Sequence, residues 1–155
     1  MWDTELGRYV PETVGEEIIT IRTCGDTQDY EVLYGDDPMI TMGYTTVFDD
    51  PTWVPYLVRA INTEQADASA AVAQFRDRVK ADRGGAERNF EVGRPYGWVR
   101  TAYVDDRTHY RLQKDDNGRA QYVMMRRLAT NAESYVATLL DRDGIVYRIR
   151  RFVRA

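Results

Sequence analysis

The stretch Thr108–Leu128, THYRLQKDDNGRAQYVMMRRL, decides the fold. Its centre, Asn117-Gly118, is a strong short-range signal for a β-hairpin, because both residue types tolerate the positive φ of a tight turn. The flanking segments 108–114 and 119–128 alternate in a period of two and are rich in residues that favour strands. The stretch therefore predicts two antiparallel strands joined by a short turn.

Working outward, the same pattern recurs along most of the chain. Segments bounded by turn residues predict six further strands, at 16–24, 29–34, 39–48, 96–104, 133–140 and 145–153. Since consecutive hairpin strands usually pair with their neighbours, the last five strands predict an antiparallel meander. The alternation directs these side chains toward the core: Tyr110, Leu112, Tyr147, Ile149 and Val153. It directs these to the opposite side: Arg148, Arg150 and Arg154.

Two helices are expected between the early and late strands. Asp50-Pro51 is a favourable helix start, with an N-cap acceptor followed by proline, and it predicts a helix over 52–61. A second helix is expected from Asn62 to about Arg83, ended by Gly84-Gly85, with an apolar stripe at Ala68, Val72, Phe75 and Val79. The expected class is therefore α+β: three N-terminal strands, a central helix pair and a five-stranded meander, with the helices packed on one face.

Length and composition indicate an ordinary folded domain. The 155 residues, 43% hydrophobic and 30% charged, predict a single domain over 1–155, with an extended N-terminal arm over 1–15. No apolar run approaches the roughly 20 residues that cross a bilayer. Cys24 is the only cysteine, which favours a small soluble protein in a reducing, cytoplasmic environment.

Charge is divided unevenly along the chain. Residues 1–68 carry 14 Asp and Glu against 3 Arg, a net charge of −11, whereas residues 69–155 carry 11 against 18, a net charge of +7. An Arg-rich sheet face, or an arginine beside aromatic residues, is a candidate for contacts with a protein or with phosphates. The candidate interaction residues are Arg126, Arg127, Arg148, Arg150, Arg154, Arg94, Tyr96 and Trp98.

Catalytic constellations are not expected. Four Asp pairs, Asp36/Asp37, Asp49/Asp50, Asp105/Asp106 and Asp115/Asp116, stand at expected turns or helix starts, where Asp bonds the following backbone. A nucleophile would have to use the single histidine, His109, with Cys24, Ser69 or Ser134, and no local nucleophile motif is present. No catalytic residue, metal or cofactor is therefore predicted. An enzyme that uses Asp pairs and a metal remains an open third alternative.

The function favoured by these patterns is a non-enzymatic protein-interaction or structural module. It would act through a protein partner or by self-association, and the composition also suits a phage or mobile-element accessory protein. The first alternative is nucleic-acid binding through the Arg-rich sheet face. Another is an acidic inhibitor that imitates nucleic-acid charge through the first half of the chain.

Overall fold

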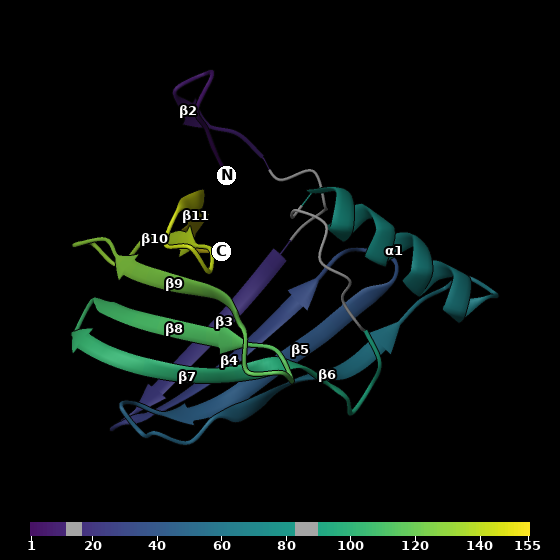
Figure 1. Cartoon of the computed structure of the whole chain (residues 1–155). Coiled ribbons are helices and arrows are strands. Elements are labelled where there is room, and N and C mark those ends of the chain that lie inside the picture. Colours follow the sequence, from purple (N-terminus) through teal and green to yellow (C-terminus); the bar gives the residue numbers. More distant parts are fainter. Residues whose placement is uncertain (12–16, 83–89) are drawn as a thin grey trace. The chain divides into compact units, whose positions relative to one another are not determined.

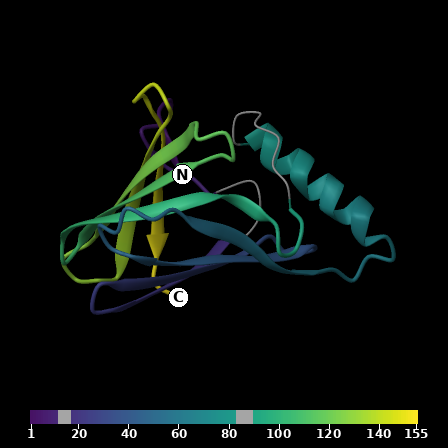
Figure 2. The same ribbon diagram turned by 60° about the horizontal axis from the view of Figure 1, so that its bottom comes forward.

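The protein is built mostly from β-strands. The computed structural model describes residues 1–11, 17–82 and 90–155 and is shown from two directions in Figures 1 and 2. The strands are β1 (Trp2–Asp3), β2 (Arg8–Tyr9), β3 (Glu17–Cys24), β4 (Thr27–Tyr34), β5 (Met39–Val47), β6 (Val54–Asn62), β7 (Pro95–Asp105), β8 (Thr108–Lys114), β9 (Ala120–Leu128), β10 (Ser134–Leu140) and β11 (Val146–Val153), and the helix is α1 (Ala68–Asp82). The expected α+β class, with a helix pair packed on one face, is wrong.

Strand order follows the chain. Strands β3 to β11 belong to one antiparallel sheet in which chain neighbours are hydrogen-bonded neighbours, and β1 and β2 form a separate two-stranded hairpin. The strands expected in the first 48 residues correspond to β3, β4 and β5, and the expected meander to β7–β11. Within the expected arm, 1–15, the described part holds the β1–β2 hairpin, and residues 12–15 lie outside the description.

The chain divides into two compact units. One, the meander unit, comprises Met1–Pro11, Thr46–Trp53 and Trp98–Ala155, and the other, the helix unit, comprises Glu12–Thr45 and Val54–Gly97. Within the described residues, α1 is the only helix, and it is neither long nor apolar enough to span a membrane.

The helix expected over 52–61 is instead strand β6. Tyr56 and Val58, two residues apart, are both buried, which is the period of a strand and not of a helix. The carboxylate of Asp50 accepts a hydrogen bond from the amide of Thr52 at 2.7 Å. Asp50 therefore closes a turn with the geometry that an N-cap would use, and no helix follows.

Helix α1 begins later than the sequence suggests. The amide of Ala70 donates to the carboxylate of Asp67 at 3.0 Å, so Asp67, and not Asn62, is the N-cap. Ala71 and Phe75 are fully buried, whereas Ala68 is exposed, so the contact stripe differs from the expected one. The side chain of Val79 and the expected stop at Gly84-Gly85 lie outside the described part of the chain.

The core of the helix unit is aromatic. Tyr30, Val32 and Tyr34 alternate along β4 and are all buried. Tyr30 stacks on Tyr44 of β5 with 4.8 Å between ring centroids, and Phe75 of α1 meets the edge of Tyr34 at 5.1 Å. Aromatic pairs in these geometries stabilise a core beyond the area that they bury.

Strand register in the meander unit sets two faces. Thr101 of β7 lies opposite Arg111 of β8, Arg111 opposite Met124 of β9, and Met124 opposite Leu139 of β10. Directly opposed residues share one face of a sheet. We call this the buried face, and its buried members are Val99, Thr101, Arg111, Gln113, Tyr122, Met124, Arg126, Ala137, Leu139 and Arg150.

The hairpin turns of the meander unit repeat one chemistry. In the loop after β8, the amide of Gly118 donates to the carbonyl of Asp115 and the amide of Asp115 donates to the carbonyl of Arg119. The loop after β10 does the same with Gly144, Asp141 and Ile145. Gly118 has a positive φ of 78°, and the described backbone shows none at Asn117. The turn is thus a longer Asp-centred loop closed by glycine, not a two-residue Asn-Gly turn.

Candidate functional site

The expected Arg face of β11 points the opposite way from the prediction. Arg150 is 5% exposed and Arg148 half-buried, whereas Tyr147 and Val153, expected inside, are exposed. Arg150 lies opposite Ala137 of β10, and Ala137 lies opposite Arg126 of β9, which is 2% exposed. Arg126 and Arg150 therefore belong to the buried face and cannot form an exposed patch.

Aromatic and amide partners accommodate the buried cations. The guanidinium of Arg150 lies 4.8 Å from the ring centroid of Phe152, and that of Arg111 lies 5.5 Å from the ring centroid of Tyr122. The side-chain carbonyl of Gln113 accepts hydrogen bonds from both Arg111 Nη2 and the hydroxyl of Tyr122. A buried polar group is tolerated when such contacts replace its water. The sequence gives no direct sign of these partners, because they come from three different strands.

His109 shares the buried face with these residues. It lies opposite Arg126 on β9, and its ring lies 5.9 Å from that of Phe48. Burial, and secondly the charge of Arg126, lower the pKa of His109 to about 4. Of the serines and the cysteine considered as nucleophiles, Cys24 is exposed in the helix unit, and Ser134 lies on the opposite face of the meander sheet.

An exposed basic row crosses the other face of the meander sheet. Arg127 of β9 lies opposite Val136 of β10, which lies opposite Arg151 of β11, and both arginines are exposed. Arg107, in the turn before β8, is also exposed and hydrogen-bonds across to the neighbouring hairpin. The predicted interaction set contains Arg127 but neither Arg107 nor Arg151. Period-two alternation back from Val153 could have placed Arg151 on the face of Val153, whereas Arg107 lies in a turn that alternation does not describe.

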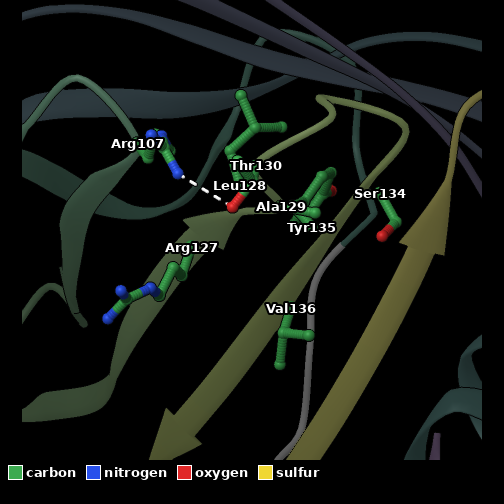
Figure 3. Close-up of a pocket in the computed structure, with 8 residues that line it drawn as sticks. All are labelled: Arg107, Arg127, Leu128, Ala129, Thr130, Ser134, Tyr135 and Val136. Carbon is green, nitrogen blue, oxygen red and sulfur yellow. Dashed lines mark hydrogen bonds between the residues drawn. The ribbon is translucent and has the colours of Figure 1, made fainter.

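A shallow pocket of about 220 Å³ opens where two hairpins of the meander unit end. Arg107 donates from Nη1 to the hydroxyl of Thr130 at 3.0 Å, the contact dashed in Figure 3, and the amide of Leu128 donates to the carbonyl of Arg107 at 2.8 Å. We call it the Arg107–Arg127 pocket, and it is lined by Arg107, Arg127, Leu128, Ala129, Thr130, Ser134, Tyr135 and Val136. No acidic residue is part of this lining.

A second hollow lies beside the tryptophans of the meander unit. Lys114 and Arg100 both lie over the ring of Trp53, at 4.7 and 5.5 Å from its centroid. The indole of Trp98 donates to the carboxylate of Asp116 at 2.8 Å. Trp98 thus connects the N-terminal part of β7 to the loop after β8 by a hydrogen bond. Because the ring of Trp53 already contacts two cations of this chain, we interpret the hollow as a local packing cluster.

The remaining candidates, Arg94 and Tyr96, have structural contacts in the helix unit. Arg94 pairs with Glu91 at 3.2 Å, and the ring of Tyr96 lies 5.4 Å from Phe90 and 5.6 Å from Tyr56. The segment from Gly93, which has a φ of 80°, is a turn that leads into β7. Both residues belong to the helix unit, whereas the other arginines of the predicted set belong to the meander unit.

Charged side chains also gather on β3, β4 and β6 of the helix unit. Arg59 contacts Glu31 at 3.0 Å and Asp29 at 3.8 Å, and Arg22 lies 3.6 Å from Asp29. All of these groups are substantially exposed. Such surface ion pairs contribute little to stability, and here they leave no excess of one charge.

The Asp pairs serve turns. Asp105 and Asp115 accept hydrogen bonds from following backbone amides, and the pKa of Asp105 is lowered first by its bond from the Arg107 amide. Asp37 accepts from the hydroxyl of Thr63, and the amide of Tyr103 donates to Asp49. Across residues 1–11, 17–82 and 90–155, no three His, Cys, Asp or Glu side chains are grouped as metal ligands would be.

Exposed apolar side chains concentrate on β11 and on the β1–β2 hairpin beside it. Strand β1 lies against β11, and Figure 1 shows the purple hairpin next to the yellow strand. Seven of the twelve large apolar side chains exposed in the described residues belong to these elements or their turns. They are Trp2, Leu6, Tyr9, Ile145, Val146, Tyr147 and Val153. Surface leucines or valines are ordinary when scattered, so their concentration on two neighbouring elements is the informative feature.

Comparison with known proteins finds no protein-family model that matches this chain. It also finds no curated protein with significant sequence similarity.

Proposed function

We propose that this protein is a non-enzymatic protein-interaction module whose docking surface comprises β11 and the β1–β2 hairpin. The observation that carries the proposal is the exposed apolar surface of these elements, where Val153 is 72% and Ile145 63% exposed. Covering such side chains with a partner removes apolar area from water, which favours association by roughly 25 cal/mol per Å². Strand β11 is also the last strand in the order of the sheet, a position from which strands can pair with another chain.

The charge around this surface favours an acidic partner. Arg151 and Arg154 are exposed on or directly after β11. The helix unit, counted from its residues, carries a net charge of −6, whereas the meander unit carries +2. A second copy of the chain therefore offers both apolar side chains and an acidic unit, and we propose it as the first partner.

The test is sedimentation equilibrium across a concentration series of the full chain. We expect reversible self-association with a dissociation constant of about 1–100 µM, the range of small transient interfaces. Val146→Glu and Val153→Glu should each weaken it at least tenfold, since a charge at an apolar contact must be desolvated. Both side chains are exposed, so the fold should tolerate the substitutions.

Val104→Glu is the matched control, because Val104 is 50% exposed, as Val146 is, and belongs to the same unit but lies on β7. It introduces the same charge and should leave the association constant unchanged. A monomeric wild type up to about 500 µM would contradict self-association at the strength expected of a transient interface. Equal weakening by Val104→Glu would show that net charge, not the docking surface, controls association.

A further inference from the structure

We infer that the Arg107–Arg127 pocket binds a phosphate group, which makes it a ligand site separate from the docking surface. The pocket uses no residue of the proposed docking surface, so the inference is independent of the proposed function. Two arginines, Arg107 and Arg127, and two residues with hydroxyl groups, Thr130 and Ser134, belong to its lining. Arginine forks and hydroxyl donors are the groups that recognise phosphate oxygens in proteins.

The Arg107 side of the pocket is held in place before any ligand arrives. Arg107 belongs to the turn between β7 and β8, and Thr130 to the loop between β9 and β10. Their side chains are joined at 3.0 Å, and the backbone of Arg107 accepts a second bond from Leu128. A donor that is already oriented loses less conformational freedom when it binds, which raises affinity.

The loop that carries Thr130 has an unusual backbone conformation. Ala132 has a φ of 59°, a left-handed value that costs a non-glycine residue roughly 1–2 kcal/mol. In the loops after β8 and β10, glycine takes the corresponding position. Strained backbone of this kind concentrates at binding sites, so the conformation supports a functional loop.

The electrostatics favour an anionic ligand. Asp105 lies close enough to Arg127 for that charge to contribute to the lowered pKa of its carboxyl. One acidic group beside two arginines leaves a net charge of +1, which attracts an anion such as phosphate. The volume of about 220 Å³ is below that of most small-molecule sites, so it suits a single phosphate group and not a whole nucleotide.

The test is an NMR titration of the full chain with inorganic phosphate, following backbone amides and arginine Nε–H signals. For a ligand of five heavy atoms, we expect saturable binding with a dissociation constant of about 0.1–10 mM. Shifts should be confined to residues 105–108 and 127–136. Parallel titrations use a phosphoserine peptide, a short oligodeoxythymidine and succinate, which distinguish a terminal phosphate, a phosphodiester and a carboxylate.

Arg107→Gln and Arg127→Gln should each weaken phosphate binding at least tenfold while the spectrum stays folded. Arg142→Gln is the matched control, because Arg142 is exposed in the same unit but lies in the loop at the other end of β10. Equal loss in all three variants, or shifts spread over the whole basic surface, would overturn the site in favour of diffuse charge attraction. Tighter binding of succinate, or of the oligonucleotide without a terminal phosphate, would overturn the assignment of a phosphate monoester.

Discussion

Ala132 has one of the two positive-φ conformations at non-glycine residues in the described chain, the other being Asp49. The amide of Ala132 donates to the carbonyl of Ala129, which closes the loop in the way that Gly118 and Gly144 close theirs. We predict that Ala132→Gly raises the free energy of unfolding by about 0.5–1 kcal/mol, because glycine relieves the left-handed strain at some cost in chain entropy. Urea denaturation at equilibrium measures it, and an unchanged or lower midpoint would refute the strain.

Gly118 lies in the same type of loop and allows the reverse substitution, from glycine to a residue with a Cβ. Its φ is 78°, and open space surrounds the position where a Cβ would lie. Gly118→Val should therefore lower the free energy of unfolding by about 1 kcal/mol or more through backbone strain alone, without a steric clash. The same denaturation series measures it, and a neutral result would mean that this loop adopts another conformation in solution.

His109 gives stability a dependence on pH. Its pKa is about 4 in the fold, below the ordinary value of 6.5, so the unfolded chain binds a proton at a higher pH than the folded chain. The stability that neutral His109 contributes is fully present above pH 6.5. As pH falls from 6.5 to about 4, the free energy of unfolding therefore decreases by at most roughly 3 kcal/mol. Chemical denaturation at half-unit pH steps should show this loss.

His109→Gln is the control, since it keeps a polar side chain that does not titrate. In that variant the slope of stability between pH 6.5 and 4 should flatten. The carboxyls of Asp50 and Asp105 also have lowered pKa values, but the stability that they contribute is lost at lower pH, below the ordinary 3.8. An unaltered slope between pH 6.5 and 4 would place the titrating group elsewhere.

At the scale of elements, the strands were predictable because their signals are local. The Asp-rich loops ending in Gly118 and Gly144 mark hairpins, and the segments between them alternate. The helix over 52–61 was wrong because Asp50 closes a turn with the hydrogen bond that an N-cap would make. The apolar residues Trp53, Leu57 and Ile61 fit a helical spacing by coincidence, while the buried pair Tyr56 and Val58 fits a strand.

The orientation of the late strands was not predictable from local pattern. Apolarity placed Tyr147 and Val153 inside, but the buried face carries Arg150 and Arg126 around Ala137. Arg150 contacts the ring of Phe152, and Arg111 on the same face contacts Tyr122 and Gln113. These partners come from several strands, so no single segment of the sequence reveals them. Arg126 and Arg150, two members of the predicted interaction set, are therefore buried, whereas Arg127 and Arg151 are exposed on the other face.

Helix α1 packs through one fully buried aromatic side chain, that of Phe75. Phe75 is fully buried, meets Tyr34 at 5.1 Å and Phe90 at 5.4 Å between ring centroids, and lies where a Cβ on Gly35 would come within 2.6 Å of its Cε2. Phe75→Ala should therefore lower the free energy of unfolding by about 3–4 kcal/mol, as deletion of a buried ring does. Thermal and urea unfolding measure it.

Gln74→Ala is the control on α1, because Gln74 is exposed one residue before Phe75. It should change stability by no more than about 0.5 kcal/mol, as exposed helix positions usually do. A small effect at Phe75 would mean that α1 detaches easily and that its apolar side faces a partner.

For the whole molecule, charge counted along the chain overstates how unevenly charge is divided between the two units of the fold. The halves 1–68 and 69–155 differ by 18 charges, whereas the helix and meander units differ by 8, because both units draw residues from each half. Several arginines of the basic half are also buried, which removes them from the surface potential. The meander unit therefore presents local basic features on a protein of net charge −4.

Nucleic-acid binding tests this balance directly. We predict that duplex and single-stranded nucleic acids bind no tighter than about 10 µM near 150 mM salt, within the range of non-specific contacts. Arg107, Arg127 and Arg151 can neutralise at most about three phosphates on duplex DNA, so the slope of log affinity against log salt should not be steeper than about −3. Fluorescence anisotropy with labelled DNA and RNA across a salt series measures both quantities. Submicromolar affinity with a steeper slope, lost in Arg127→Gln and Arg151→Gln, would mean that the basic row is a nucleic-acid interface and would displace the proposed protein docking.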